Sequence, residues 1–261
     1  MHMNTPTDNT GRLEQLVTFA RESPFSDFYR NKWRGEKAFE RLPHSSRADF
    51  LAVPLSHRRY KKEKGMVKIV GTGEQAFLSE WSFSDIGREP YAPHSMRPFV
   101  YLTDPYEAVE KSLWCYENGM MPLVGEKDSD MAIFAAGRYQ IDSLIVDEQS
   151  LAKFAPFFST LRTPLASISV IGSAFSPNTL MSFERYAQSI RLVLALPETG
   201  AFAEAPLSRV PKFTPLPRCH VEHDSEIVLT KIARYPTPII RYKTGIRTTP
   251  AEDGPSFSLA A

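Results

Sequence analysis

The middle of the chain alternates apolar positions at helical spacing with short continuous apolar runs. A helix is predicted to begin after Asp104, because its side chain can cap free backbone amides and Pro105 fits the first helical turn. Apolar side chains then recur at helical spacing until Gly119, a residue that favours a helix end. The same pattern predicts further helices at 129–138, 147–161 and 176–190, and short apolar runs or buried strands at 121–124, 144–146, 168–171 and 192–194.

Strands that alternate with helices of this length predict crossover units and a parallel sheet. A parallel sheet needs helices on both faces, because its strands are buried on both sides. We therefore predict an α/β fold, with a nucleotide-binding-like core over residues 61–200.

The segments before and after this core lack its alternation of helix and strand patterns. Residues 1–60 contain a predicted helix at about 12–22, followed by irregular, aromatic-rich chain that we expect to pack on the core. Prolines become dense after Gly200, and two apolar runs at 226–232 and 239–243 are joined without a helix, which favours antiparallel pairing. We expect a β-rich subdomain over 201–248 and a flexible tail over 249–261.

Composition and charge narrow the partners. The 261 residues carry a formal net charge of +1 with acids and bases well mixed, so we expect no nucleic-acid partner. No apolar run is long enough for a membrane span and the amino terminus has no secretory signal, which makes cytoplasm the expectation. Two cysteines, Cys115 and Cys219, cannot form a disulfide framework. The basic run 58–64 is interpreted as a solvated loop, with a phosphate or CoA contact as the alternative.

Four segments occur in an order that is typical of one enzyme family. They are Ser23–Arg30 with Leu42-Pro43 and Arg47–Phe50; Val170–Pro177; Leu194–Gly200; and Glu226–Thr230 followed by Pro238–Gly245. The last segment is the most specific, because it is very similar to a pattern written GE-I-V-x-T…P-x-I-R-Y-R-T-G-D. Together they resemble the adenylate-forming, AMP-producing acyl and aryl–CoA ligases, especially the phenylacetate–CoA ligase branch.

The resemblance implies a reaction and a site. Members of the family join a carboxylic acid to the α-phosphate of ATP and then pass the acyl group to a thiol, often CoA. By resemblance, Gly172, Ser173, Ala174 and Ala195 border a nucleotide crevice, Glu198 holds magnesium, and Thr199 is its catalytic neighbour. The expected ligands are ATP or AMP with magnesium and a small organic or aryl acid, with CoA as a further candidate. Arg241 and Tyr242 either contact the cofactor or simply hold their strand.

Several positions depart from the family pattern. The best phosphate-loop candidate is Gly71-Thr72-Gly73, but Glu74 follows it, and a carboxylate facing phosphates is unfavourable. Ile246 stands where the family has a ribose-binding aspartate, so that acceptor is lost. We also expect the family's small carboxyl-terminal lid domain to be absent, because residues 247–261 include no lysine.

Two functional hypotheses therefore remain open. In the first, the chain is a shortened acid-activating ligase. In the second, it is a non-catalytic protein that binds a small molecule and acts through a partner, either another protein or a second copy that covers the crevice. Other chemistries are disfavoured: Gly172-Ser173 lacks the second glycine of a hydrolase elbow, and Cys219-His220 with His223-Asp224 matches no standard zinc spacing.

Overall fold

The computed structural model describes residues 10–61, 65–82, 95–125, 130–232, 235–250 and 256–260. The chain divides into two compact units. The first combines Met1–Phe83 with Arg218–Gly245, and the second combines Ser84–Pro217 with Ile246–Ala261. This division differs from the boundaries expected at 60, 200 and 248, because segments distant in sequence pair with one another.

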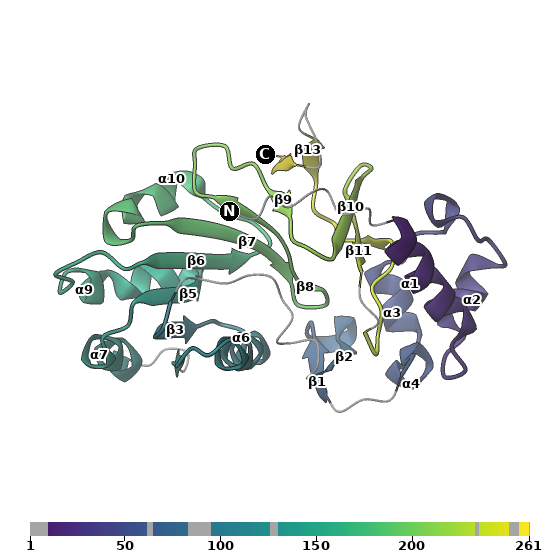
Figure 1. The fold of residues 1–261 in the computed structure, drawn as a ribbon, viewed down its shortest axis with the longest axis horizontal. Helices are drawn as coiled ribbons and strands as arrows, with labels where there is room; N and C mark the ends of the chain where they lie inside the picture. The colour runs from purple at the N-terminus through teal and green to yellow at the C-terminus, as the bar shows by residue number, and fades with distance from the viewer. Residues whose placement is uncertain are drawn as a thin grey trace. The chain divides into compact units, whose positions relative to one another are not determined.

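The second unit is built on a seven-stranded sheet of order β4-β3-β5-β6-β7-β8-β9 (Figure 1). Strands β4, β3, β5, β6 and β7 run parallel to one another, and β8 and β9 continue the sheet antiparallel. The bounds are β3 Pro98–Tyr101, β4 Leu123–Val124, β5 Ser143–Asp147, β6 Ser167–Gly172, β7 Ile190–Leu196, β8 Gly200–Pro206 and β9 Thr214–Pro215. The predicted parallel sheet is confirmed, and β8 and β9 belong to it rather than to a separate β-rich subdomain.

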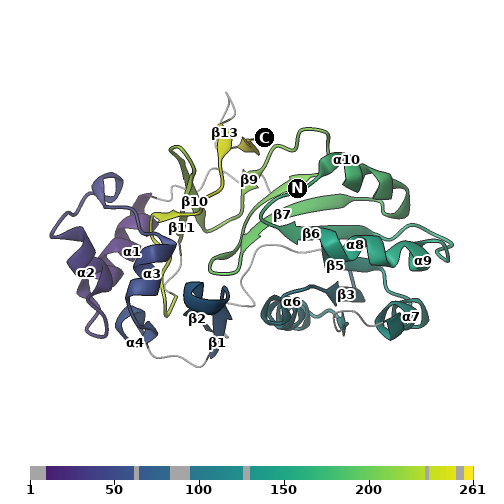
Figure 2. The same ribbon diagram turned by 180° about the vertical axis from the view of Figure 1, so that it is seen from behind.

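Helices connect the parallel strands on both faces. Along the strand order, the connection from β3 leads to β4 on one side, whereas the connections to β5, β6 and β7 lead towards the other side. Connections between parallel strands are right-handed, so α6 covers one face of the sheet and the later helices cover the other. Figure 2 shows α8, α9 and α10 beside β5, β6 and β7. The bounds are α6 Pro105–Glu117, α7 Asp130–Tyr139, α8 Glu148–Leu151, η3 Ala152–Phe154, α9 Ala155–Phe158, α10 Pro177–Leu180 and η4 Met181–Tyr186.

Local sequence signals explain where these helices begin and end. The Asp104 side chain accepts hydrogen bonds from the backbone N–H groups of Tyr106 at 2.8 Å and Glu107 at 3.2 Å. Gly119 follows the end of α6 by two residues and has φ +77°, in the left-handed region that favours glycine. The prediction of one helix over 147–161 was wrong: α8, η3 and α9 replace it, because Pro156 has no N–H to continue the ladder. The predicted start of α7 at Ser129 lies outside the described residues.

The first unit joins the amino-terminal helices to a three-stranded antiparallel sheet of order β10-β11-β12. Buried apolar side chains from both parts form one core, which includes Leu16, Tyr29, Trp33 and Ile240. The Tyr29 hydroxyl donates to the carbonyl of Pro238 at 2.8 Å and thereby ties the two parts together. The bounds are α1 Thr10–Glu22, α2 Phe28–Trp33, η1 Phe39–Arg41, α3 Arg47–Ala52, α4 Leu55–Arg58, β1 Gly65–Val70, η2 Gly73–Gln75, β2 Phe77–Ser82, β10 Cys219–His223, β11 Ile227–Lys231 and β12 Tyr242–Lys243. The predicted antiparallel pairing of 226–232 with 239–243 is confirmed.

The basic run at 58–64 is not a solvated loop at its start. Arg58 is buried and donates to the carbonyls of Val53 at 2.9 Å and Leu78 at 2.6 Å. Burial lowers the pKa of Arg58, which lies over the ring of Phe50. Arg59 pairs with Glu80 at 2.7 Å. These contacts fix the chain that leads into β1; residues 62–64 lie outside the described residues.

The expected flexible tail is partly ordered. Strands β13 (Thr248–Pro250) and β14 (Phe257–Leu259) pair antiparallel. Phe257 is fully buried and stacks on Phe213 with ring centroids 5.8 Å apart, and the two residues exchange backbone hydrogen bonds. The sequence did not indicate these two strands, because a single aromatic anchor leaves no periodic signal. In the described part of the chain, no helix has the length and apolar character that a membrane crossing requires.

Candidate functional site

The carboxyl edge of the parallel sheet brings two predicted loops together. Gly172 at the end of β6 is in register with Leu194 of β7, so the chains leaving these strands start side by side. The first loop folds back tightly, since a Cβ on Gly172 would lie 3.3 Å from the carbonyl oxygen of Ala174. Ser173 and Ala174 are exposed at this edge. Ligands of open α/β sheets bind at such edges, outside the carboxyl ends of the strands.

The second loop is a tight turn between β7 and β8. The register of β7 with β8 shifts at this end: Leu194 pairs with Ala203 but Ala195 pairs with Ala201, so Phe202 is an extra residue on β8. The turn is closed by the backbone N–H of Thr199, which donates to the carbonyl of Leu196 at 3.0 Å, and by Gly200 with φ +64°. The Thr199 hydroxyl donates to the Gly200 carbonyl at 3.0 Å, so its visible role is to hold the turn.

Glu198 is the charged group of this turn. Its side chain is buried, with 6% of the residue exposed, and its Oε2 atom is enclosed by protein. A carboxylate can serve as one ligand of magnesium, which commonly takes one or two carboxylates and completes its shell with water and substrate phosphates. The described residues contain no group of three or more His, Cys, Asp or Glu arranged to hold a metal, so water and substrate phosphates would supply the other ligands.

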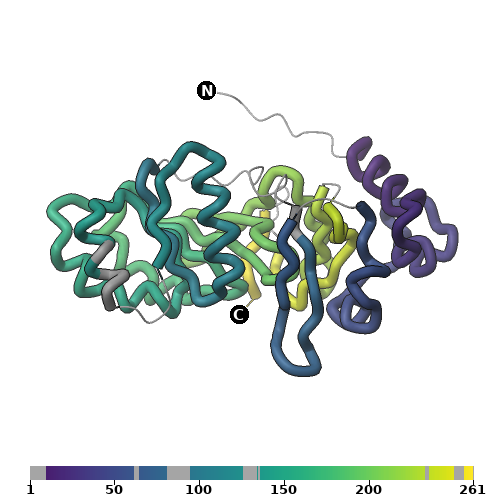
Figure 3. The backbone as a smooth tube through the Cα atoms, turned by 90° about the horizontal axis from the view of Figure 1, so that it is seen from below, coloured from purple at the N-terminus to yellow at the C-terminus, as the bar shows by residue number. Residues whose placement is uncertain are grey.

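The predicted phosphate loop is the tip of a hairpin in the first unit. Val70 of β1 pairs with Phe77 of β2, and Gly71-Thr72-Gly73 begins the connection; Figure 3 shows this hairpin as a long blue loop. Gly71 has φ +88°, and a Cβ there would lie 2.1 Å from Nη2 of Arg47. Arg47 donates to the carbonyl of Gln75 at 3.0 Å and lies over the ring of Phe77. Sequence reasoning missed this cation, because a residue 28 positions from its partner gives no local signal.

Arg241 is held by structural contacts. Its Nε and Nη2 atoms donate to the two carboxylate oxygens of Glu222 at 3.0 and 2.8 Å, and Nη1 donates to the carbonyls of Glu40 and Leu42. Burial first, and then the charges of Arg241 and Lys243, lower the pKa of His44. These contacts favour the strand-holding interpretation of Arg241.

The ring of Phe50 lies between Tyr242 of β12 and Phe77 of the β1–β2 hairpin. Tyr242 stacks on Phe50 with centroids 5.3 Å apart, and Phe50 in turn meets Phe77 at 5.8 Å. Tyr242 is 1% exposed. A cofactor role for Arg241 or Tyr242 stays a prediction.

The predicted residues therefore fall into two groups. One group lies in the second unit, at or just beyond the carboxyl ends of the neighbouring strands β6 and β7: Gly172–Ala174, Ala195 within β7, Glu198 and Thr199. Gly71–Gly73, Arg241 and Tyr242 lie in the first unit.

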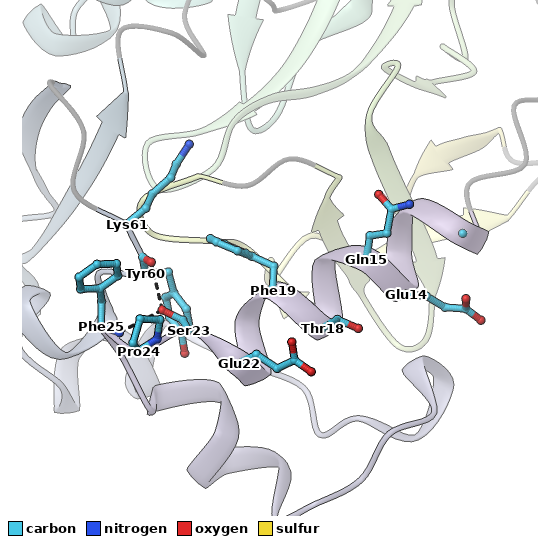
Figure 4. A pocket seen from close by; sticks show the side chains of 11 residues that line it. Glu14, Gln15, Thr18, Phe19, Glu22, Ser23, Pro24, Phe25, Tyr60 and Lys61 are labelled. Atoms are coloured by element: carbon cyan, nitrogen blue, oxygen red, sulfur yellow. Dashed lines mark hydrogen bonds between the residues drawn. The ribbon is translucent and has the colours of Figure 1, made fainter.

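The first unit also has a concavity of about 700 Å³ along α1 (Figure 4). Part of its wall is Ser23-Pro24-Phe25, from the first family-like segment. The Ser23 hydroxyl donates to the carbonyl of Tyr60 at 3.0 Å and fixes this wall. The lining mixes Glu14 and Glu22 with Lys61 and includes none of the predicted nucleotide-site residues. Its mixed charge selects no particular ligand.

Comparison with solved structures identifies the fold. A structure of 2-hydroxyisobutyryl-CoA ligase in an open conformation, with 2-HIB-AMP and CoA bound, matches with a TM-score of 0.71 at 12% identity, over 95% of this chain and 67% of that one. The amide bond synthetase McbA from Marinactinospora thermotolerans matches with a TM-score of 0.59 at 16% identity, over 75% and 48%. E. coli MenE with bound OSB-AMS matches with a TM-score of 0.57 at 10% identity, over 74% and 47%.

These matches define a class of fold. The chain has the architecture of acyl-adenylate-forming ligases, and it spans about two thirds of the 2-hydroxyisobutyryl-CoA ligase and about half of the other two. No protein-family model matches the sequence, and no curated protein sequence matches it. The phenylacetate–CoA ligase branch stays a prediction of the sequence.

Proposed function

We propose that this chain binds ATP and a small organic or aryl carboxylic acid, or the acyl-adenylate formed from them, and belongs functionally with the acid-activating ligases. The observation that supports the proposal is that the Gly172–Ala174 loop and buried Glu198 follow the carboxyl ends of two neighbouring parallel strands, β6 and β7. Solved neighbours of the same fold hold adenylates, such as 2-HIB-AMP. CoA is bound in that neighbour too, and is the acceptor that we propose here.

Each predicted residue has a physically reasonable role. The loop of Gly172, Ser173 and Ala174 would take the adenine, with Ala195 beside it, because small side chains let a flat ring approach closely. Glu198 would hold magnesium, and Thr199 would keep its turn in place. Bound magnesium offsets the negative charge of phosphates during transfer. Within the first unit taken by itself, Gly71–Gly73 remains the candidate phosphate loop, with the Arg47 guanidinium at the same hairpin tip. Arg241 and Tyr242 would hold β12 in place.

Glu198→Gln tests the metal role. The amide keeps the size of the carboxylate and removes its charge, so magnesium-dependent ATP binding should weaken about tenfold or more, whereas AMP binding without metal should change little. Glu204→Gln on β8 is the control: its carboxylate pairs with Arg191 at 3.4 Å on the surface. Magnesium–ATP affinity equal to wild type in Glu198→Gln would remove Glu198 from the site.

A second candidate is a non-catalytic binding protein that acts through a partner or a second copy of itself. Ile246 favours the binding protein, because an isoleucine side chain cannot accept hydrogen bonds from the ribose hydroxyls that the family's aspartate binds. Pyrophosphate release across a panel of carboxylic acids separates the two candidates. Nucleotide binding with no acid-dependent pyrophosphate would support the binding protein, and acid-dependent release would support the ligase.

A further inference from the structure

A hollow of about 540 Å³ lies between two helical faces of the second unit. One wall is Phe134, Gly137 and Arg138 of α7, at positions i, i+3 and i+4. The other wall is Lys153, Pro156, Phe157 and Thr160, at positions i, i+3, i+4 and i+7 along η3, α9 and the residues that follow. Residues at these spacings share one side of a helix. The hollow is thus the seam between two helical segments.

Gly137 keeps this seam open. A Cβ at position 137 would have its nearest neighbours, two ring atoms of Phe157, at 3.9 Å, which is ordinary contact distance. Glycine inside a helix is less favourable than alanine by about 1 kcal/mol. Since packing leaves room for a side chain, no steric need accounts for the glycine. Its structural effect is the empty volume itself.

The lining combines an apolar floor with a cationic rim. Phe157 is 6% exposed and packs against Phe154 and Phe158, so the floor is rigid. Phe134 is 60% exposed at the mouth, and Cζ of Arg138 lies 5.6 Å from the centre of its ring. Lys153 lies on the opposite wall. Of the described residues that line the hollow, two carry positive charge and none carries negative charge.

We propose that this seam is a second binding site, for a small amphipathic anion whose aryl or alkyl body fills the hollow and whose carboxylate faces Arg138 and Lys153. The volume is within the usual range for small-molecule pockets. The site is separate from the proposed adenylation site. Gly137 and Thr160 precede the amino ends of β5 and β6, whereas Glu198 follows the carboxyl end of β7. The two sites therefore lie at opposite ends of the parallel strands, one at the amino ends and one at the carboxyl ends.

Calorimetric titration with naphthoate, and separately with decanoate, tests the site in the full chain. The neutral naphthamide should bind about fivefold to tenfold more weakly than naphthoate, because it loses the charge-assisted contacts. The double variant Arg138→Gln with Lys153→Gln should weaken naphthoate by a similar factor. Arg185→Gln is the matched control, since Cζ of Arg185 lies 4.7 Å from the ring centre of Tyr186 outside the hollow. Comparison of the two acids shows whether an aryl or an alkyl body fits better.

Gly137 variants locate the ligand. Gly137→Leu should reduce naphthoate affinity by about tenfold or more by filling the hollow, while Gly137→Ala should reduce it less and keep or raise the melting temperature. Circular dichroism shows whether each variant folds. If Gly137→Leu does not fold, the naphthoate affinity of Gly137→Ala tests the site. Naphthoate affinity that is unchanged in both Gly137 variants would overturn the proposal. Equal affinity for naphthoate and naphthamide, or no binding of naphthoate and none of decanoate, would also overturn it. A loss of ATP binding in Glu198→Gln leaves these outcomes unaffected.

Discussion

Replacement of Arg241 by alanine tests the contacts that join β12 to the amino-terminal helices. The guanidinium makes a two-pronged ion pair with Glu222 and donates to the carbonyls of Glu40 and Leu42. The side chains of Arg241 and Glu222 are 10% and 24% exposed. Breaking a buried pair costs about 3–5 kcal/mol, and the partial exposure of Glu222 lowers our expectation to about 2–4 kcal/mol of unfolding free energy.

Urea unfolding measured by fluorescence and circular dichroism gives this value, with buried Trp33 reporting on the same unit. Arg191→Ala is the control, because its pair with Glu204 is 46% and 31% exposed and should contribute less than about 1 kcal/mol. The midpoint of Arg241→Ala should fall well below that of the control. Similar midpoints for the two variants would show that the contacts of Arg241 do not stabilise the unit, and the strand-holding interpretation would fail.

Three further changes should alter stability, each measured by urea unfolding. Phe257→Ala should lower the unfolding free energy by about 3–4 kcal/mol, because it removes a fully buried ring; a change below about 1 kcal/mol would contradict the ordered tail. Gly71→Ala should cost about 1–3 kcal/mol, since φ is +88° and a Cβ would lie 2.1 Å from a guanidinium nitrogen; a neutral effect would show that the hairpin tip rearranges freely. Burial lowers the pKa of His220 below its ordinary 6.5, so the unfolded chain binds the proton more readily and stability should fall as the pH drops below about 6.5. His220→Leu should flatten that decline, and an unchanged slope would contradict the assignment.

Local patterns predicted β5, β6 and β7 because these strands are continuous apolar runs between clear helix signals, whereas β3 and β8 were not predicted. Every residue of β6 before Gly172 is buried, as a strand covered on both faces requires. The division into units could not be predicted in the same way. It depends on pairings such as that of Ser45 with Tyr242, where Ser45 exchanges backbone hydrogen bonds with Arg241 and Lys243. Such long-range contacts leave no periodic trace in either segment.

The same reasoning applies to the candidate site. Glu198 was predicted because it lies in a family-like loop after a predicted strand, and Thr199 and Gly200 close the turn that carries it; its metal role stays a prediction. Arg47 was missed as a neighbour of Gly71, because only the folded hairpin brings the guanidinium to the loop. Arg241 sits in the most specific motif, yet its donors are used by the protein itself, which no motif can reveal.

We propose above that this chain binds adenine nucleotides. Calorimetric titration of the purified chain with AMP, and separately with ATP and magnesium, tests it most directly. Saturable binding of both, with ATP affinity that depends on magnesium and falls in Glu198→Gln, is the predicted result. Absence of binding of either nucleotide at about millimolar concentration, equivalent to less than about 4 kcal/mol of binding free energy, would contradict the claim for this chain.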